Sequence, residues 1–487
     1  MLIAKKTPSK ETSLYMYTNQ QASQVQQSIT HYTKKCNVHT FMDVLNSPEY
    51  IDKIEALFPA QRVRLFSPKL TVSMFMAQAL NEDSSCQKIV DEVAIKQALN
   101  GRPTCSTNTG AYCKARQRMP LVLPSTLTRY TGQLLSANSP HQWHWKNRPI
   151  RLVDGMTSSL PDTAANQAAY PQPGSQKPGL GFPLCRMVSI ICLGSGALLD
   201  MASGPCKGKG SDEQTLLRSM LDTLQTDDVL LGDTLYATYF LLCALKDKGV
   251  DGVLKDKNVD GVFEQHGSRR LTTDFSQGEL LGARAHMITI HKSKKKPDWM
   301  AQDEYDRAPA TLRVRELKTG GKILVTTLLC AHKTPKIALQ KLYKERWHIE
   351  VDFRNIKTTM GMEILSCRTP SMVEKEMWIY LLAYNLIRLL MAQSALLAGV
   401  MPRQISFKHT VQLWIAWQGR HYEYDYFIHP YIGELFILIA QQQVGRRPGR
   451  MEPRAVKRRP KPFPLLTKPR TQAREEIRKN GHPKKLK

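Results

Sequence analysis

A chain of 487 residues is too long for a small disulfide-stapled fold and, at roughly 100 to 200 residues per domain, has room for two to four domains with substantial cores. Its 69 Lys and Arg against 42 Asp and Glu give a formal charge of +27, which points to a polyanionic partner, with nucleic acid the first candidate and a membrane surface the second. The ten cysteines include no Cys-x-x-Cys pair and no Cys/His cluster at zinc-ligand spacing, which argues against a structural zinc site and favours reduced thiols in the cytoplasm.

The first 147 residues are expected to form a polar segment followed by a helical domain. Residues 1–30 are rich in Ser, Thr and Gln and are expected to be poorly ordered. Over residues 31–147, helical spacing of apolar residues predicts helices at Phe41–Phe58, Thr71–Leu80 and Ile89–Leu99. Tyr112 stands among cations in the stretch 106–118, which indicates either a surface that contacts the DNA backbone or an ordinary solvated helix face.

Short apolar runs bounded by turns then predict an α/β catalytic domain over residues 148–400. The expected order is strands at Ile150–Val153, Met187–Leu193 and Ala197–Met201, a helix from about Asp212, a strand at Val229–Leu231, a helix at Ala237–Lys248 and a strand at Val250–Leu254. Ser211 and Gln214 would form a capping box at the start of the first helix. Three strands, helix, strand, helix, strand is the order of a ribonuclease-H-like fold.

Two aspartates stand where apolar strands end. Asp154 ends the run Ile-Arg-Leu-Val-Asp, and Asp233 ends Val-Leu-Leu-Gly-Asp. In the ribonuclease-H order these are the first and fourth strands, which lie side by side and parallel, so both carboxylates would reach one edge of the sheet. A single Asp after a strand is more often a turn or capping residue, and only a third converging carboxylate would overturn that interpretation.

About eighty residues, 255–334, separate the last of these strands from the next helix, which is too long for a plain loop. Apolar runs of β type predict strands at Gly261–Phe263, His286–Ile290, Leu312–Leu317 and Lys322–Leu329. We therefore expect an inserted β-rich subdomain. Its run of cations at 292–296 is by default a solvated loop, with a contact to the DNA backbone as the second interpretation.

The next predicted helix carries four functional side chains in one narrow wedge. At 100° per residue, Tyr343, Arg346, Glu350 and Lys357 fall within about 60° of one another, with apolar residues on both flanks. The remaining polar side chains, Asp352 among them, are assigned to the solvated face. A carboxylate set among cations in an apolar frame is costly to bury unless partners or a metal compensate, which favours a phosphate-handling active site.

Residues typical of helix ends stand on both sides of this helix. Thr334 is the expected N-cap, Pro335 the first helical residue, and Gly361 lies near the end. The alternative is an ordinary amphipathic helix on which Arg346 and Glu350 form a pair worth only a few tenths of a kcal/mol. The pair alone favours that alternative, whereas the whole four-residue pattern favours a site.

The C-terminal part is predicted to contain helices and a basic tail. The most apolar stretch predicts a long helix at Lys375–Leu397 that packs on the core and, because Asn385 and Arg388 interrupt it, does not span a membrane. A helical region follows over 401–445. Residues 446–487 carry sixteen Lys and Arg against three Glu, with seven prolines, and are expected to be a largely disordered arm that lies on phosphates.

The Tyr-x2-Arg-x3-Glu-x6-Lys spacing at residues 343–357 resembles the signature helix of the insertion sequence 4 family of bacterial DDE transposases. Two further motifs carry the resemblance, namely Asp154-Gly-Met-Thr with Pro161-Asp-Thr and Asn166, and Gly232-Asp-Thr-Leu-Tyr236. The resemblance extends from about Leu65 to Arg470. Family members usually have Thr or Ser in place of Met156 and often Arg-Gly-Tyr in place of Thr234-Leu-Tyr, and neither difference removes a carboxylate.

The resemblance implies a ribonuclease-H-like transposase that cuts and joins DNA. It implies that two Mg²⁺ ions, with Mn²⁺ as a substitute, are held by Asp154, Asp233 and Glu350. It also implies that Tyr343, Arg346 and Lys357 grip DNA phosphates near the cleavage point. An inserted aromatic, here Trp299, would receive a flipped base while a hairpin forms at the transposon end, and a buried core Trp is the alternative for this residue.

The implied partners are the terminal inverted repeats of an insertion sequence and the target DNA. The helical domain over 31–147 would help to bind the transposon ends, and the chain would act as a homodimer in the DNA complex. Two rival hypotheses remain open, a metal-dependent nuclease without strand joining and a catalytically inactive DNA-binding relative. Joined DNA products would exclude the first, and the presence of all three carboxylates disfavours the second.

Overall fold

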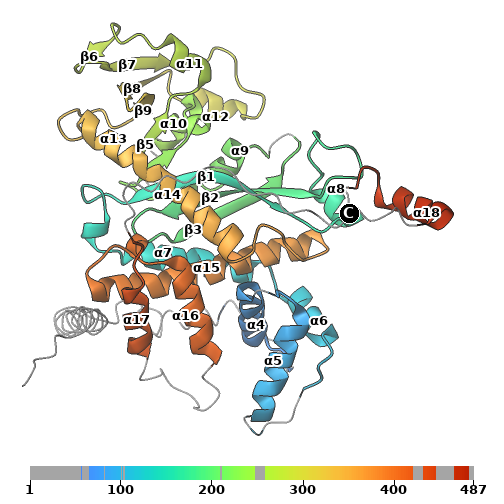
Figure 1. Ribbon diagram of the computed structural model, residues 1–487. Coiled ribbons are helices and arrows are strands. Elements are labelled where there is room, and N and C mark those ends of the chain that lie inside the picture. Colours follow the sequence, from blue (N-terminus) through green and yellow to red (C-terminus); the bar gives the residue numbers. More distant parts are fainter. Residues whose placement is uncertain are drawn as a thin grey trace, which may run out of the picture.

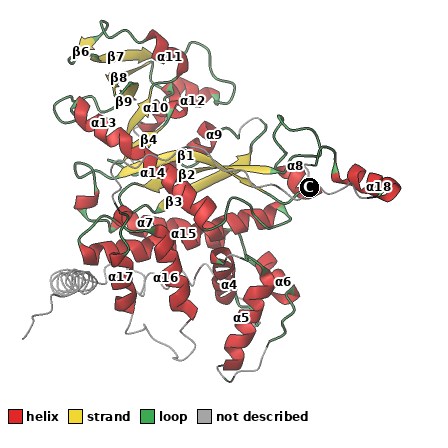
Figure 2. Cartoon of the chain, in the orientation of Figure 1, coloured by secondary structure: helices red, strands yellow, loops and turns green. Residues whose placement is uncertain are grey.

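The computed structural model describes residues 56, 65–81, 83–99, 101, 105–208, 211–246, 258–419, 432–445 and 466–481 (Figure 1). The predicted strand at Val250–Leu254, the polar segment 1–30 and, apart from Ala56, the predicted helix at Phe41–Phe58 lie outside these residues. Figure 2 shows a mixed α/β protein in which α4, α5, α7, α15, α16 and α17 lie below the central strands of a long sheet and β6–β9 lie at its far end. The described cysteines are free thiols.

The N-terminal described region is helical, as predicted. Its helices are α4 (Pro68–Leu80), α5 (Cys86–Leu99), α6 (Gly110–Arg118) and α7 (Val122–Ala137). Tyr112, a candidate DNA contact, is instead fully buried, and its hydroxyl donates a hydrogen bond to Gln78 Oε1 at 3.0 Å. The neighbouring Arg116 also donates to Gln78, so this Tyr and this cation hold α6 against α4.

Within the described residues, nine strands form one continuous sheet in the order β3-β2-β1-β4-β5-β9-β8-β7-β6. They are β1 (Ile150–Ser159), β2 (Leu184–Cys192), β3 (Leu198–Pro205), β4 (Val229–Gly232), β5 (Asp260–Glu264), β6 (Glu279–Leu280), β7 (Ala285–His291), β8 (Thr311–Thr319) and β9 (Lys322–Thr326). The pairs β1–β4 and β4–β5 are parallel, and all other pairs are antiparallel.

The strand at Gly261–Phe263 has a different place from the one expected. It was expected in the insertion, but as β5 it pairs in parallel with β4, with Val229 opposite Asp260. The crossover between the two strands passes through α10 (Tyr239–Leu245). The three later predicted strands are confirmed as β7, β8 and β9, and β9 joins them to the same sheet by pairing with β5.

Helices cover both faces of the central strands. Alternate residues of β1 point to opposite faces, so Leu152 joins a core with α7, α14 (His348–Arg354) and α15 (Pro370–Ala398). Val153 joins a second core with α9 (Glu213–Arg218) and α10 on the other face. Figure 1 shows α15 running under the sheet with α7 beside it.

Helix α15 confirms the predicted long apolar helix and is, by length and composition, apolar enough to cross a membrane. Its most apolar window is 83% buried inside the protein, which is typical of a core helix. Asn385 in its middle is fully buried and makes hydrogen bonds with the main chain of Thr128 and Leu198. The polar interruption therefore ties three elements together instead of meeting solvent.

The remaining helices are short. They are α8 (Ala164–Ala169), α11 (Gly267–Thr272), α12 (Gln302–Arg307), α13 (Lys336–Lys344), α16 (Phe407–Gly419), α17 (Ile432–Gln441) and α18 (Arg470–Asn480). The single-turn segments are η1 (His141–Trp143), η2 (Leu221–Thr223), η3 (Thr234–Tyr236), η5 (Glu345–Trp347), the π-helical η6 (Asn355–Thr359) and η7 (Pro402–Gln404).

Three local predictions differ from the structure. The N-cap of α9 is Asp212, whose side chain accepts from Thr215 N, so Ser211 does not form the expected capping box. Helix α13 begins after Pro335 rather than with it. In the tail, α18 replaces part of the expected disordered arm, because residues 470–480 contain good helix formers and no proline.

Candidate active site

The two aspartates that were expected to end strands both lie just beyond the last paired residues of β1 and β4. Strands β1 and β4 run parallel with Leu152 opposite Leu231, and Asp154 and Asp233 each follow two residues later. Asp154 remains within β1, whereas β4 ends at Gly232, so Asp233 begins the turn that follows. The matched register brings both carboxylates to the end of the same pair of strands.

Asp154 is a partly buried carboxylate with two donors. Its Oδ1 accepts a hydrogen bond from Gly155 N at 2.8 Å, and its Oδ2 accepts from Arg346 Nη1 at 3.0 Å. Burial is the largest effect on the pKa of Asp154 and raises it; the two donors lower it, the nearby negative charges of Asp233 and Glu213 raise it, and the net value is about 6. A carboxylate in such surroundings gains from an additional cation.

Asp233 is fixed by its own turn. It is the N-cap residue of η3, and its Oδ1 accepts a hydrogen bond from Leu235 N at 2.9 Å. The Asp-Thr-Leu-Tyr motif therefore encodes a capped 3₁₀ turn at the end of a buried strand.

The signature helix is one path made of four segments: α13, η5, α14 and η6. It contains a 3₁₀ turn around Arg346 and a π turn around Lys357. The angle of 100° per residue that was assumed for the prediction therefore does not apply along its whole length. Such π turns are frequent at functional sites. The segment after the helix is tied to β1, since Ser158 Oγ donates to Met362 O at 2.8 Å and Ser159 N donates to Glu363 O at 2.9 Å.

Arg346 links the helix to the strand. Besides its contact with Asp154, its Nη2 lies 3.4 Å from Glu350 Oε1. The pair of Arg346 and Glu350 that an ordinary amphipathic helix would have is therefore present. The same guanidinium also contacts the carboxylate of Asp154 in β1, 192 positions away in the sequence. Glu350 thereby faces the edge that carries Asp154 and Asp233.

Tyr343 has a position different from the other members of the wedge. It is 7% exposed, and its hydroxyl donates a hydrogen bond to Gly232 O at 3.2 Å. Burial raises the pKa of Tyr343 above its usual range. The hydroxyl expected to grip DNA is thus occupied inside the protein, at the residue before Asp233.

Asp352 lies on the buried side of the signature helix and not on the predicted solvated face. It is 0% exposed and forms ion pairs with Arg388 of α15 and, at 2.8 Å, with Arg403. Two cations offset the cost of burying one carboxylate. The ion pair with Arg388 holds the buried side of the signature helix against α15. The apolar pattern of the sequence did not indicate this contact.

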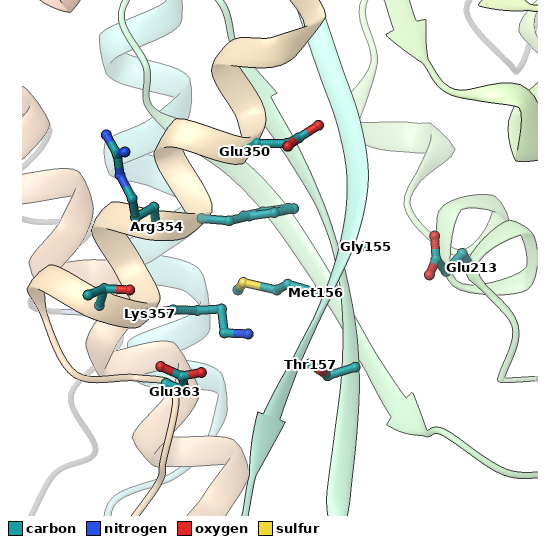
Figure 3. A pocket seen from close by; sticks show the side chains of 10 residues that line it. Gly155, Met156, Thr157, Glu213, Glu350, Arg354, Lys357 and Glu363 are labelled. Atoms are coloured by element: carbon teal, nitrogen blue, oxygen red, sulfur yellow. The ribbon is translucent and has the colours of Figure 1, made fainter. Parts of the chain in front are cut away.

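A pocket of about 450 Å³ lies beside Glu350 (Figure 3). Its lining residues include Glu350 and Lys357 from the signature helix, Gly155 from β1, and Glu213 from α9. In Figure 3, Glu213 approaches from the opposite side of β1 to Glu350. Sequence reasoning missed Glu213, because the space that Gly155 leaves for its carboxylate becomes visible only in the folded structure.

The donor set suits a hard divalent cation, because Mg²⁺ prefers carboxylate oxygens. Among the described residues, no three Asp, Glu, His or Cys side chains lie close enough together to hold one ion. Arg346 stands between Asp154 and Glu350 and offsets their charges. The residue types therefore fit the expected metals, and the side chains of Asp154, Asp233 and Glu350 would have to converge further to share them.

Trp299 is 47% exposed, so it is not the buried core residue of the alternative interpretation. The guanidinium of Arg218, the last residue of α9, lies 3.8 Å from its ring centroid, and Phe240 contacts its ring edge-on. Two of the neighbouring cations bind main-chain oxygens, since Lys292 Nζ donates to Tyr305 O and Ala308 O, and Lys296 Nζ donates to Met300 O. Those two lysines support the loop that presents the Trp.

Comparisons with known proteins match this chain to transposases. A family model described as "Transposase DDE domain" matches residues 145–386. The chain is 28% identical over 461 residues to "Transposase InsG for insertion sequence element IS4" of Escherichia coli (strain K12), covering 90% of this chain and 97% of that protein. It is also 29% identical over 140 residues to "Putative transposase InsZ" of the same organism, covering 28% of this chain and 46% of that protein.

A solved structure, the cryo-EM structure of the piggyBac transposase synaptic complex with hairpin DNA, is similar with a TM-score of 0.40 and 9% identity over 82% of each chain. The family match begins before Asp154 and ends beyond Lys357, so it contains the strand acids and the complete signature helix. The chain is therefore a DDE transposase of the insertion sequence 4 type.

Proposed function

We propose that this transposase cuts and joins DNA at a ribonuclease-H-like core with Asp154, Asp233 and Glu350 as its metal-binding acids. The strand order β3-β2-β1-β4-β5, with β1, β4 and β5 parallel, supports that core. The observation that carries the proposal is the contact of Arg346 with both Asp154 and Glu350. One guanidinium touches both carboxylates, so Glu350 of the signature helix lies near Asp154 of β1.

Two Mg²⁺ ions, with Mn²⁺ as a substitute, would be held by these three carboxylates and would activate the attacking oxygen and stabilise the leaving oxygen on the DNA phosphorus. The protein side chains would do the positioning. Arg346 would exchange part of its carboxylate contact for a phosphate when metal offsets the acids. Lys357 lines the pocket beside Glu350 and would bind a phosphate there.

Tyr343 would contribute differently from its expected role as a phosphate contact. Its hydrogen bond to Gly232 O sets the distance between the signature helix and the end of β4. Trp299 would stack a flipped base on the face that Arg218 does not cover.

The proposed substrates are the terminal inverted repeats of an insertion sequence and a target DNA. InsG is named for an insertion sequence element, and the +27 charge of this chain suits a nucleic-acid partner. By family resemblance, the route is cut-and-paste through a hairpin, in a homodimer that acts in the cytoplasm.

The test is cleavage of DNA that carries the inverted repeats flanking the gene. Asp154→Asn, Asp233→Asn and Glu350→Gln should each abolish Mg²⁺-dependent nicking and strand transfer while end binding remains, because metal ligation needs the charge and folding does not. The control is Asp303→Asn, which removes an aspartate from a solvent-exposed pair with Arg307 on α12 and should leave activity unchanged.

Two outcomes would overturn parts of the proposal. Wild-type cleavage by Glu350→Gln would remove the signature helix from the catalytic machinery. Nicking by the wild-type protein without any joined product would favour the rival nuclease, and end binding without cleavage would favour the inactive relative.

A further inference from the structure

Helix α9 contacts the turn that carries Asp233 through two adjacent side chains. Tyr236 of η3 donates its hydroxyl hydrogen to Glu213 Oε2 at 3.2 Å. Gln214 Nε2 donates to Leu235 O at 2.8 Å. Both contacts reach residues of the turn that begins immediately after Asp233, so the first turn of α9 fixes that turn from the side opposite the signature helix.

Gly155 makes room for this arrangement. A Cβ at position 155 would lie 2.4 to 2.7 Å from the carboxylate atoms of Glu213, closer than atoms approach without displacement. The Glu213 carboxylate therefore lies directly against the main chain of β1, one residue after Asp154. It thus contacts the strand of Asp154 on one side and, through Tyr236, the turn of Asp233 on the other.

Tyr236 depends on Glu213 for its hydrogen bond. The Tyr236 side chain is fully buried, and a buried hydroxyl without an acceptor costs about 1 to 3 kcal/mol. Glu213 supplies a charged acceptor, and its own side chain is 25% exposed, with Arg186 Nε 4.0 Å away. The pair therefore gives the turn a single favoured position relative to β1.

We propose that Glu213 is a positioning residue of the active site, which holds Tyr236 and with it the turn of Asp233 so that Asp233 and Asp154 can bind the same metal. The proposal rests on the proposed function, in which Asp233 is a metal ligand. Glu213 acts through Tyr236 and does not itself bind the ion.

Three variants separate positioning from ligation. Glu213→Gln keeps an oxygen that can accept from Tyr236 but removes the charge. Glu213→Ala removes both, and Tyr236→Phe removes only the donor. Loss of an interaction that orients a metal ligand typically weakens metal affinity about 10-fold or more.

The measurements are Mn²⁺ binding to the full chain by electron paramagnetic resonance and the Mg²⁺ dependence of nicking at saturating DNA. We expect Glu213→Ala and Tyr236→Phe to require about tenfold more metal in both assays. The nicking rate at saturating metal should return close to that of the wild type, and Glu213→Gln should stay near wild type throughout.

A defective Glu213→Gln beside a normal Tyr236→Phe would overturn the proposal, because the charge of Glu213 would then be needed and the residue would be a metal ligand. Unchanged metal binding in Glu213→Ala and Tyr236→Phe would also overturn it. If Glu213→Ala lowers the unfolding temperature, Tyr236→Phe, which removes one oxygen atom, decides the question alone. Asp233→Asn tests the proposed function separately, since normal metal binding in that variant would remove Asp233 from the ligands whatever Glu213 does.

Discussion

The hydroxyl of Tyr343 donates a hydrogen bond to the main-chain oxygen of Gly232, 3.2 Å away. The bond joins the signature helix to the last residue of β4, immediately before Asp233. At the other end of the same helix, the main chain of residues 362–365 is hydrogen-bonded to Ser158 and Ser159 of β1. Glu350 lies between these two attachments, so its position relative to both strand acids is set by the fold.

Tyr343→Phe should therefore impair positioning more than DNA binding. Removing the hydroxyl should lower the free energy of unfolding by about 1 kcal/mol and slow nicking, while the affinity for transposon ends and its salt dependence stay unchanged. Tyr305→Phe is the control, since Tyr305 also donates to a main-chain oxygen, that of Ser293, but far from the acids in sequence. A large loss of end affinity with a flatter salt dependence would instead assign Tyr343 to a phosphate.

Arg346 is expected to need its forked geometry. Arg346→Lys keeps the charge, but an ammonium cannot bridge Asp154 and Glu350 as two guanidinium nitrogens do. We expect Arg346→Ala and Arg346→Lys to retain Mn²⁺ binding and to nick at least about tenfold more slowly, with poorly aligned cuts. Full activity of Arg346→Lys would show that charge alone suffices.

Lys357→Ala should act on the substrate and not on the metals. Its ammonium lines the pocket beside Glu350, so its loss should raise the DNA concentration needed for half-maximal nicking and lower the slope of log affinity against log salt by about 1. The Mg²⁺ requirement should not change. A changed Mg²⁺ requirement with normal DNA affinity would contradict a phosphate contact.

Trp299→Ala should separate two steps of the reaction. First-strand nicking should persist while hairpin formation falls, because a stacked base offsets the cost of unstacking. Arg218→Ala uncovers one face of the ring and should leave hairpin formation intact, which makes it the matched control. Equal loss of both steps in Trp299→Ala, together with a lowered unfolding temperature, would make the residue a packing element.

Asp260 at the start of β5 predicts a pH dependence of stability. Burial raises its pKa, but hydrogen bonds from Lys246, Thr327 and Arg148 and the charge of Lys246 outweigh burial and leave the pKa lowered. A lowered folded-state pKa contributes stability above the unfolded pKa of about 3.9 and loses it as the pH falls through the folded value.

Asp260→Asn should therefore cost about 3 kcal/mol at pH 7, as when one partner of a buried ion pair is removed, and the difference from wild type should shrink below about pH 4. Urea unfolding at several pH values measures this. The exposed pair of Asp303 and Arg307 provides the comparison, because Asp303→Asn should change stability by less than about 1 kcal/mol. A cost for Asp260→Asn that is independent of pH would contradict the ion-pair origin.

The strand acids and the signature helix could be predicted from the sequence because each is a pattern of residues close together in the chain. Asp154 and Asp233 follow apolar runs, and the wedge of the signature helix is written within 15 residues. The sequence did not reveal the parallel place of β5, because the short apolar run at Gly261–Phe263 has the same pattern whichever strand it pairs with. The role of Glu213 depends on the space left by Gly155, a relation between two distant positions.

The periodicity of apolar residues also could not predict whether a polar side chain of a helix faces solvent or the core. Tyr112 was expected on a surface that either contacts DNA or is solvated, and Asp352 on a solvated face, yet both are fully buried with partners on other elements. Burial of a polar group depends on whether a partner exists across the interface, and that partner is not visible in the residue's own helix.

The pairing of β9 with β5 has a mechanical consequence for the segment between these two strands, residues 265–321. Strands in a hydrogen-bonded ladder cannot rotate about a single bond, so this segment cannot swing on a linker like a tethered module. Moving β7 and β8, which are joined by the loop that carries Trp299, relative to Asp233 means bending the sheet or breaking a row of main-chain hydrogen bonds. The continuous sheet therefore sets the distance between the base of this loop and the acids before any substrate binds.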